Sequence, residues 1–74
     1  MPESEFGLAT MYRIIKKAGA ERVGDDAADE LRKVLEETGI AVSKHAVELA
    51  SHAGRKTVRS QDIKLAAKST LKIS

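Results

Sequence analysis

The sequence predicts an all-α protein made of a short helix, a strap loop, a long central helix, a second strap loop and a short helix. Two observations carry this prediction. Apolar residues recur at helical spacing from residue 25 to residue 53 with no proline between them, which is typical of one long helix. Gly19, Gly24 and Gly54 stand at the edges of the apolar stripes, where they mark the ends of helices and the straps between them.

The central helix is too long for this chain to cover alone. About 29 residues at 1.5 Å per residue make a rod of roughly 43 Å, whereas a compact chain of 74 residues has a radius of gyration of about 11 Å. We therefore expect a second chain, because the short flanking helices cannot bury such a rod. The apolar stripe consists of Ala27, Leu31, Val34, Leu35, Thr38, Val42, Ala46, Leu49 and Ala53.

The first short helix is expected over residues 8–18, after a flexible lead-in at residues 1–7. Gly19 suits the left-handed position that ends a helix. Lys16 and Lys17 fall in the last turn, where they complement the helix dipole whether or not they also bind a partner. The first strap (residues 19–24) follows, and Gly24 or Asp25 caps the central helix. The apolar stripe of this short helix contains Leu8, Met11, Ile14, Ile15 and Ala18.

The last helix is expected to follow the second strap (residues 55–58). Ser60 is a good N-cap and Asp62 lies in the first turn. The helix should end near Ser69 or Thr70, so the folded domain is expected over residues 8–70 and a short tail over residues 71–74. Both straps contain β-compatible pairs, Arg22-Val23 and Thr57-Val58, which could lie side by side in an antiparallel pair of chains.

Basic charge gathers at the two ends of the central helix. The net charge is only +2, but residues 13–22 hold four bases and one acid, and residues 55–72 hold six bases and one acid. Such clustering of basic residues favours binding to a polyanion, although a solvent-exposed surface of mixed charge also explains it. The chain has no cysteine and no apolar run of the ~20 residues that a membrane span needs. We expect an intracellular, soluble protein that does not bind membranes.

No pattern of an enzyme or of a metal site is present. The sequence has no glycine-rich phosphate loop and no nucleophile beside a base. The adjacent acids at 25–26 and 36–37 point about 100° apart on a helix, so they do not form a catalytic pair. His45 and His52 lie seven residues apart without further ligands, which does not favour metal binding. We predict no enzymatic activity, no cofactor and no metal.

The chain resembles an archaeal histone over roughly residues 8–68. The specific motifs are Ala-Gly-Ala-Glu-Arg-Val at residues 18–23 and His-Ala-Gly-Arg-Lys-Thr at residues 52–57. Shorter matches are Arg-Ile-Ile-Lys at 13–16, Asp-Asp-Ala at 25–27, Ala-Val-Glu-Leu-Ala at 46–50 and Asp-Ile-Lys-Leu-Ala at 62–66. The resemblance implies the histone fold, a handshake homodimer, and a chromosome-associated protein of the cytoplasm that wraps duplex DNA.

The resemblance also implies roles for individual residues. Arg22 would enter the minor groove, and Arg13, Lys56 and Thr57 would approach phosphates. Arg55 and Asp62 would form an ion pair that braces the second strap. With the neighbouring bases, the predicted DNA-binding set is Arg13, Lys16, Lys17, Arg22, Arg55, Lys56 and Thr57. The predicted surface between dimers is Leu49, His52, Asp62 and Leu65.

The sequence departs from the family at positions near these sites. Gly24 stands where serine is common, Ser51 where a base is common, and Lys64 where an acid is common. We therefore expect dimers to join on DNA but to stack weakly between turns of a superhelix. The alternative interpretation is a histone-fold dimerisation subunit of a transcription complex with weak DNA contact. The sequence leaves open whether the chain also forms a heterodimer with another histone. It also leaves open the length of DNA that is wrapped.

Overall fold

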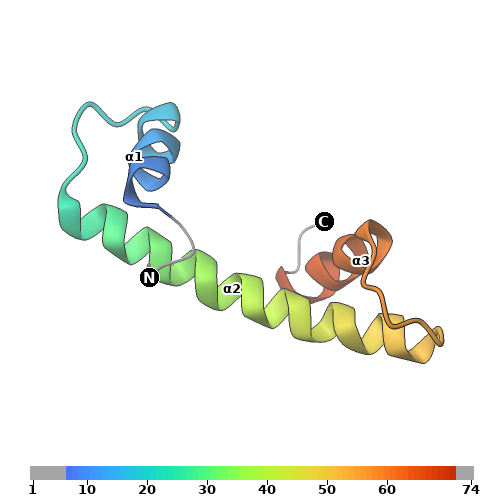
Figure 1. Ribbon diagram of the computed structural model, residues 1–74. Helices are drawn as coiled ribbons and strands as arrows, with labels where there is room; N and C mark the ends of the chain where they lie inside the picture. Colours follow the sequence, from blue (N-terminus) through green and yellow to red (C-terminus); the bar gives the residue numbers. More distant parts are fainter. Residues whose placement is uncertain (1–6, 72–74) are drawn as a thin grey trace. The chain divides into compact units, whose positions relative to one another are not determined.

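The computed structural model describes residues 7–71 (Figure 1). These residues form three α-helices joined by the two straps, and they contain no strand. The helices are α1 (Leu8–Lys17), α2 (Asp25–His52) and α3 (Ser60–Leu71). The predicted all-α class and the order of short, long and short helices are confirmed. Residues 1–6 and 72–74, most of the predicted lead-in and tail, lie outside the described residues.

The chain divides into two compact units, Met1–Glu37 and Thr38–Ser74, and the boundary falls within α2. In the N-terminal unit, α1 packs against the first turns of α2 (Figure 1). Met11 of α1 and Ala28 of α2 have no exposed surface. The fully buried residues of this unit are thus one long flexible side chain and one small one. Tyr12, Ile15, Ala20, Val23, Leu31 and Leu35 are half-buried around it.

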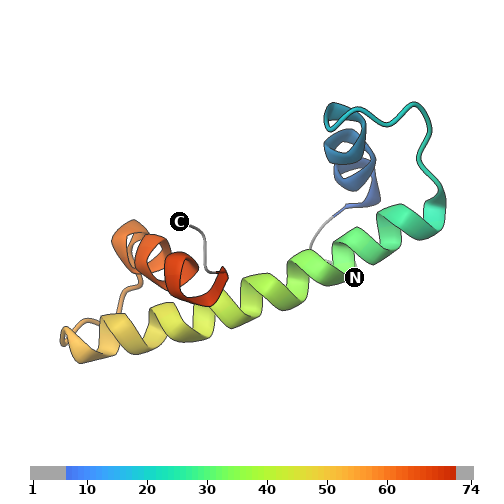
Figure 2. The same cartoon turned by 180° about the vertical axis from the view of Figure 1, so that it is seen from behind.

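In the C-terminal unit, α3 folds back along the last turns of α2, as seen from behind in Figure 2. The core here consists of small residues: Val42, Ala46 and Ala66 are buried, and Leu49 and Ala67 pack against them. Ala46 and Ala66 are fully shielded from solvent. Small side chains at both surfaces let the two helices approach closely, so this unit is held by tight packing of few atoms.

Large apolar side chains remain in solvent in both units. The single chain therefore leaves apolar surface uncovered, and this surface includes Leu8, Ile14 and Val34 of the predicted apolar stripes. These exposed residues are Leu8, Ile14, Val34, Ile40, Val47, Val58, Ile63, Leu65 and Leu71. Over the described part of the chain, none of the helices has the length and apolar character of a membrane span.

Candidate nucleic-acid interface

The first strap leaves α1 through a fixed backbone geometry. Gly19 has a φ of 116°, a left-handed conformation that side chains disfavour. The Gly19 N–H donates to the Lys16 carbonyl at 3.0 Å, and the Ala20 N–H donates to the Ile15 carbonyl at 3.4 Å. These two bonds satisfy carbonyls at the end of the helix. The position predicted to end the first helix does so, and the strap starts in a defined direction.

The second strap leaves α2 in the same way. Gly54 has a φ of 77°. Its N–H donates to the Ser51 carbonyl at 2.9 Å, and the Arg55 N–H donates to the Ala50 carbonyl at 2.9 Å. Each strap therefore begins at a left-handed glycine with the same pair of hydrogen bonds, and a valine follows four residues later in each, Val23 and Val58.

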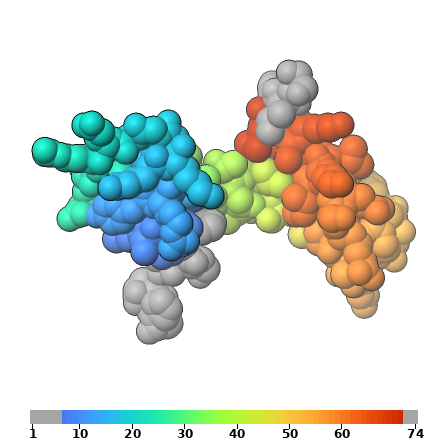
Figure 3. Space-filling model, turned by 90° about the horizontal axis from the view of Figure 1, so that it is seen from above, coloured from blue at the N-terminus to red at the C-terminus, as the bar shows by residue number. Residues whose placement is uncertain are grey.

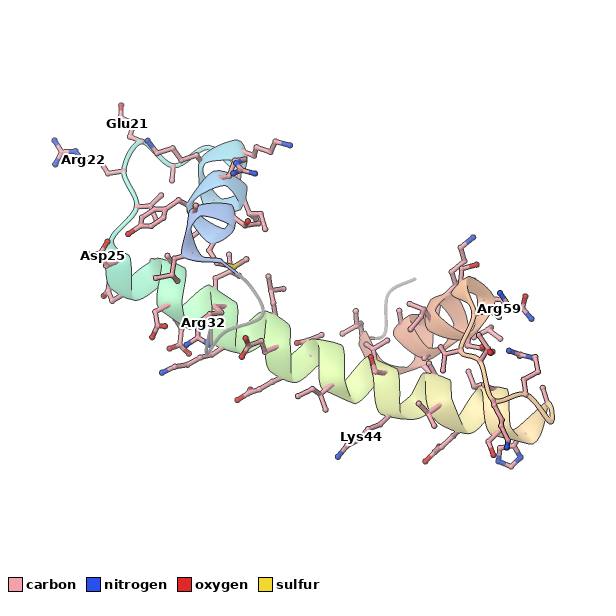
Figure 4. All side chains as sticks on the ribbon, in the orientation of Figure 1. Glu21, Arg22, Asp25, Arg32, Lys44 and Arg59 are labelled. Atoms are coloured by element: carbon pink, nitrogen blue, oxygen red, sulfur yellow. The ribbon has the colours of Figure 1, made fainter. Side chains whose placement is uncertain are left out.

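Arg22 is the exposed base of the first strap. Its neighbour Val23 is half-buried, which anchors the strap while the arginine stays in solvent. Figure 4 shows Arg22 directed away from the ribbon, and Figure 3 shows the first strap projecting from the surface of the N-terminal unit. Among residues 7–71, Arg22 takes part in no ion pair. Its guanidinium is therefore available to an external anion.

A hydrogen bond joins the two helices that flank the first strap. The Tyr12 hydroxyl of α1 donates to the Asp25 carboxylate, which belongs to the first residue of α2. This bond raises the pKa of Tyr12, and burial and the negative charge of Asp25 add to the shift. The hydroxyl therefore stays protonated, and able to donate, throughout the neutral range.

The second strap is braced by a two-pronged ion pair. The Arg55 guanidinium places Nη1 2.8 Å from Oδ2 of Asp62 and Nη2 2.9 Å from Oδ1 of the same carboxylate. Nη1 also donates to the Thr57 carbonyl at 3.1 Å. Asp62 is only 2% exposed. The guanidinium is occupied within the strap, so the local role of Arg55 is to hold the backbone of its neighbours.

Asp62 also caps α3, and here one detail of the sequence prediction is wrong. The Arg59 N–H donates to Oδ2 of Asp62 at 2.7 Å, and the Asp62 and Ile63 N–H groups donate back to the Arg59 carbonyl. The N-cap is therefore Arg59, and Ser60 is the first residue of the helix. The hydrogen bond from Arg55, followed by the one from the Arg59 N–H, lowers the pKa of Asp62 to about 2.

The exposed cations and the hydroxyl of the second strap lie next to this brace. Lys56 and Thr57 are exposed, and so is Arg59 immediately after the strap. Arg59 was not among the predicted DNA-binding residues, although it adds a third base within five residues. The run Arg-Lys-Thr-Val-Arg at 55–59 was a sufficient signal for it. Figure 4 shows its side chain extending from the surface.

The predicted basic residues of α1 are all exposed. Arg13 lies on the outer face, and Lys16 and Lys17 occupy the last turn of the helix, as expected from the sequence. They share the N-terminal unit with Arg22. α1 and the first strap therefore present four bases that face solvent, and their roles toward DNA stay predictions.

The residues predicted to join dimers lie in different environments within the C-terminal unit. Leu49 packs against the small core, whereas His52 and Leu65 are exposed. Leu65 is 57% exposed, a large value for an apolar side chain. Asp62 is buried and already accepts three N–H groups. The joining surface stays a prediction, with Leu65 and His52 as its accessible members.

The acidic turns of α2 are balanced internally and hold no metal cluster. Arg32 pairs with Asp29 at 2.8 Å and with Glu36 at 3.2 Å, and Lys33 lies 3.7 Å from Asp29. The hydrogen bond from Arg32 lowers the pKa of Asp29. Residues 7–71 contain no group of three or more histidine, aspartate or glutamate side chains arranged to hold a metal. This face differs from Arg22, Lys56 and Arg59 at the straps, which take part in no ion pair among the described residues.

Comparisons with known proteins agree with these features. The family described as histone-like transcription factor (CBF/NF-Y) and archaeal histone matches residues 4–67. One of the subunits of the archaeal histone HAN1 from Thermococcus zilligii is 54% identical over 65 residues, covering 88% of this chain and 97% of the relative. The probable archaeal histone 3 of Methanocaldococcus jannaschii is 43% identical over 63 residues, covering 85% and 94%.

The family match spans both straps and all of α1 and α2, and the members of this family are structural DNA-binding proteins and not enzymes. The order of a short helix, a long helix and a short helix is that of the histone fold. On this evidence the chain belongs to the archaeal histones.

Proposed function

We propose that this chain packages duplex DNA, and that two copies form a handshake dimer that wraps or compacts DNA with little sequence specificity. The observation that carries the proposal is the pair of straps, each fixed by a left-handed glycine and each presenting exposed residues suited to phosphates. Bases that lack internal partners offer full charge to a polyanion. Contacts of this kind position the protein without reading bases.

The dimer is supported by the apolar surface that each unit leaves in solvent. Val34, Ile40 and Val47 lie along α2 with 46%, 58% and 54% of their surfaces exposed. An antiparallel pairing of two α2 helices would bury the stripe that contains Val34 and would set the first strap of one chain beside the second strap of its partner. Ile40 and Val47 lie about 120 to 140° around the helix from Val34, so this pairing does not cover them. A chain of 74 residues without disulfides gains most of its stability in this way.

Dilution tests the dimer. An obligate dimer unfolds at a lower temperature as the chain is diluted, because dissociation and unfolding are linked. Leu35→Asp places a charge in the shared apolar surface and should abolish folding at concentrations where wild type is folded. A folded monomer whose melting temperature does not change with concentration would contradict the proposal.

Nuclease digestion of reconstituted complexes on long DNA tests wrapping. Protected fragments of regular length are expected, and the step between them measures the DNA bound by each added dimer. The alternative is a histone-fold subunit of a transcription complex. It is favoured by the words "histone-like transcription factor" in the description of the matching family. A smear without protected fragments, together with a stable dimer, would support that alternative.

Crosslinking tests the joining of dimers. On long DNA, we expect tetramers and larger species through Leu49, His52 and Leu65. His52→Asp or Leu65→Glu should reduce these species to dimers and leave binding to a short duplex largely intact, because both side chains are exposed. Wild type that never exceeds a dimer on long DNA would contradict this part of the proposal. Weak stacking between turns predicts that Lys64→Glu increases compaction.

A further inference from the structure

We propose that Tyr12 and Asp25 form a clasp that closes the first strap and keeps Arg22 directed outward for DNA. The inference rests on the proposed DNA role of Arg22 and adds the residues that position it. Tyr12 is thus a positioning residue that acts through the strap, without touching DNA itself. No motif of the sequence pointed to this pair.

The clasp closes the strap at its two ends. Tyr12 lies in α1 and Asp25 is the first residue of α2, so the hydrogen bond between them spans 13 residues of sequence and encloses the strap. At one end, Gly19 fixes the exit from α1 by two backbone bonds. At the other end, the Gly24 carbonyl accepts from the Ala28 N–H at 3.2 Å. Without the clasp, the strap would be held only by the backbone bonds at each helix end and by the half-buried Ala20 and Val23.

The clasp also occupies a carboxylate close in sequence to Arg22 on its C-terminal side. Asp25 is three residues from Arg22, and an unengaged carboxylate at this distance along a strap attracts a guanidinium. A guanidinium held by Asp25 would have to be freed before it could reach a phosphate. With Tyr12 donating to Asp25, Arg22 makes no ion pair within the described residues and points into solvent (Figure 4).

The N-terminus of α2 complements this arrangement. Asp25 and Asp26 occupy its first turn, where the helix dipole stabilises negative charge. The Asp25 carboxylate is therefore a strong acceptor for a phenol. A hydrogen bond to a charged acceptor is roughly twice as strong as a neutral one. An exposed bond of this kind can persist in water while still opening when DNA contacts require it.

The absorbance of tyrosine tests the clasp without DNA. The chain has one tyrosine and no tryptophan, so titration of the ultraviolet absorbance reports Tyr12 alone. In wild type, the pKa of Tyr12 should lie above its ordinary value of 10.0. Asp25→Asn should lower the pKa, while the control Asp26→Asn should leave it unchanged. An ordinary pKa in wild type, or equal values in wild type and Asp25→Asn, would overturn the proposal.

A double-mutant cycle tests the link to Arg22. Tyr12→Phe removes only the hydroxyl and should weaken binding to a short duplex by about 2- to 10-fold, the range of one hydrogen bond. In the Arg22→Ala background the same change should have no effect, because the residue to be positioned is absent. In the Lys56→Ala background it should weaken binding as much as in wild type. Lys56 is the matched control, since it belongs to the other strap.

The outcomes separate this proposal from the proposed function. If Arg22→Ala weakens binding but Tyr12→Phe matches wild type, the clasp has no positioning role and DNA packaging stands. Additive losses in the double variant of Tyr12 and Arg22 would likewise overturn the positioning role. If Arg22→Ala binds as tightly as wild type, the DNA role of the first strap fails and the clasp proposal fails with it.

Discussion

The two straps begin alike and are closed by different chemistry. Each starts at a left-handed glycine, and each is held by an acid in the first turn of the helix that follows, Asp25 or Asp62. Asp25 accepts one phenol at the surface. Asp62 accepts two N–H groups of Arg55 and the Arg59 N–H, and is 2% exposed.

This difference sets how firmly each strap is held. A buried carboxylate with three donors is costly to disturb, because any lost partner leaves part of a charge unsatisfied. An exposed hydrogen bond can exchange its partner with water at little cost. We therefore expect Lys56 and Thr57 to be presented on a rigid strap and Arg22 on one that adjusts. A side chain that enters a groove of variable width benefits from such adjustment.

Removing the two acids gives the largest expected contrast. Asp62→Ala deletes the partner of Arg55 and the cap of α3 together, so the melting temperature should fall severalfold further than in Asp25→Ala. The measurement is thermal unfolding of both variants at equal chain concentration. Similar losses in the two variants would contradict the difference in rigidity that we infer.

Acid should weaken the second strap through Asp62. The hydrogen bond from Arg55 lowers the pKa of Asp62 from 3.8 to about 2. Because the folded-state value lies below the unfolded one, the stabilisation is complete above the unfolded pKa and is lost as the pH falls through about 2. Melting temperatures of wild type should fall across this window.

Asp62→Asn is the control for this acid effect. It removes the titrating group, so its melting temperature should depend less on pH in the same window. Asp29 also has a lowered pKa, through its hydrogen bond with Arg32, and it contributes to the dependence that remains. Equal pH dependence in wild type and Asp62→Asn would show that Asp62 is not the responsible group.

The salt dependence of DNA binding compares the straps directly. Each phosphate contact that is lost should reduce the log–log slope of affinity against salt by about 1, hence about 2 per dimer. Lys56→Ala should show this change. Arg59→Ala tests the base that the sequence prediction missed, with the exposed Lys44 of α2 as a control outside the straps. An unchanged slope in Lys56→Ala would remove that residue from the interface.

The sequence predicted what depends on local chemistry. Helix periodicity placed all three helices to within one or two residues, and the rarity of left-handed backbone made Gly19 and Gly54 reliable ends. The N-cap of α3 was misplaced because Ser60 has a strong capping propensity. The Asp62 carboxylate instead reaches the Arg59 N–H, and a bond of that geometry favours the residue before the serine.

Contacts between distant residues could not be predicted from periodicity. The pairing of Arg55 with Asp62 entered only through the resemblance to archaeal histones. The pairing of Tyr12 with Asp25 was not anticipated, because it depends on how α1 is set against α2 after folding. Propensity and charge patterns describe one helix or strap at a time. Each of these two bonds depends on how two such elements are placed relative to each other.

The smallest expected effect concerns Gly24. Gly24 is the N-cap of α2, since its carbonyl accepts from the Ala27 and Ala28 N–H groups at 3.0 and 3.2 Å. It has no side chain to satisfy a further N–H of the first turn. Serine supplies that acceptor and is worth a few tenths of a kcal/mol over glycine. Gly24→Ser should therefore stabilise the fold slightly.

Space at this position permits the serine. A Cβ on Gly24 would lie 2.6 Å from Oδ1 of Asp26, but that atom is the end of an exposed side chain that can rotate away. Gly24 is not among the left-handed glycines, unlike Gly54, so a side chain causes no backbone strain. Denaturant unfolding should give a small gain for Gly24→Ser and a loss of about 1 to 2 kcal/mol for Gly54→Ser. A loss at both positions would mean that Asp26 cannot move, and that its carboxylate helps to fix the end of the first strap.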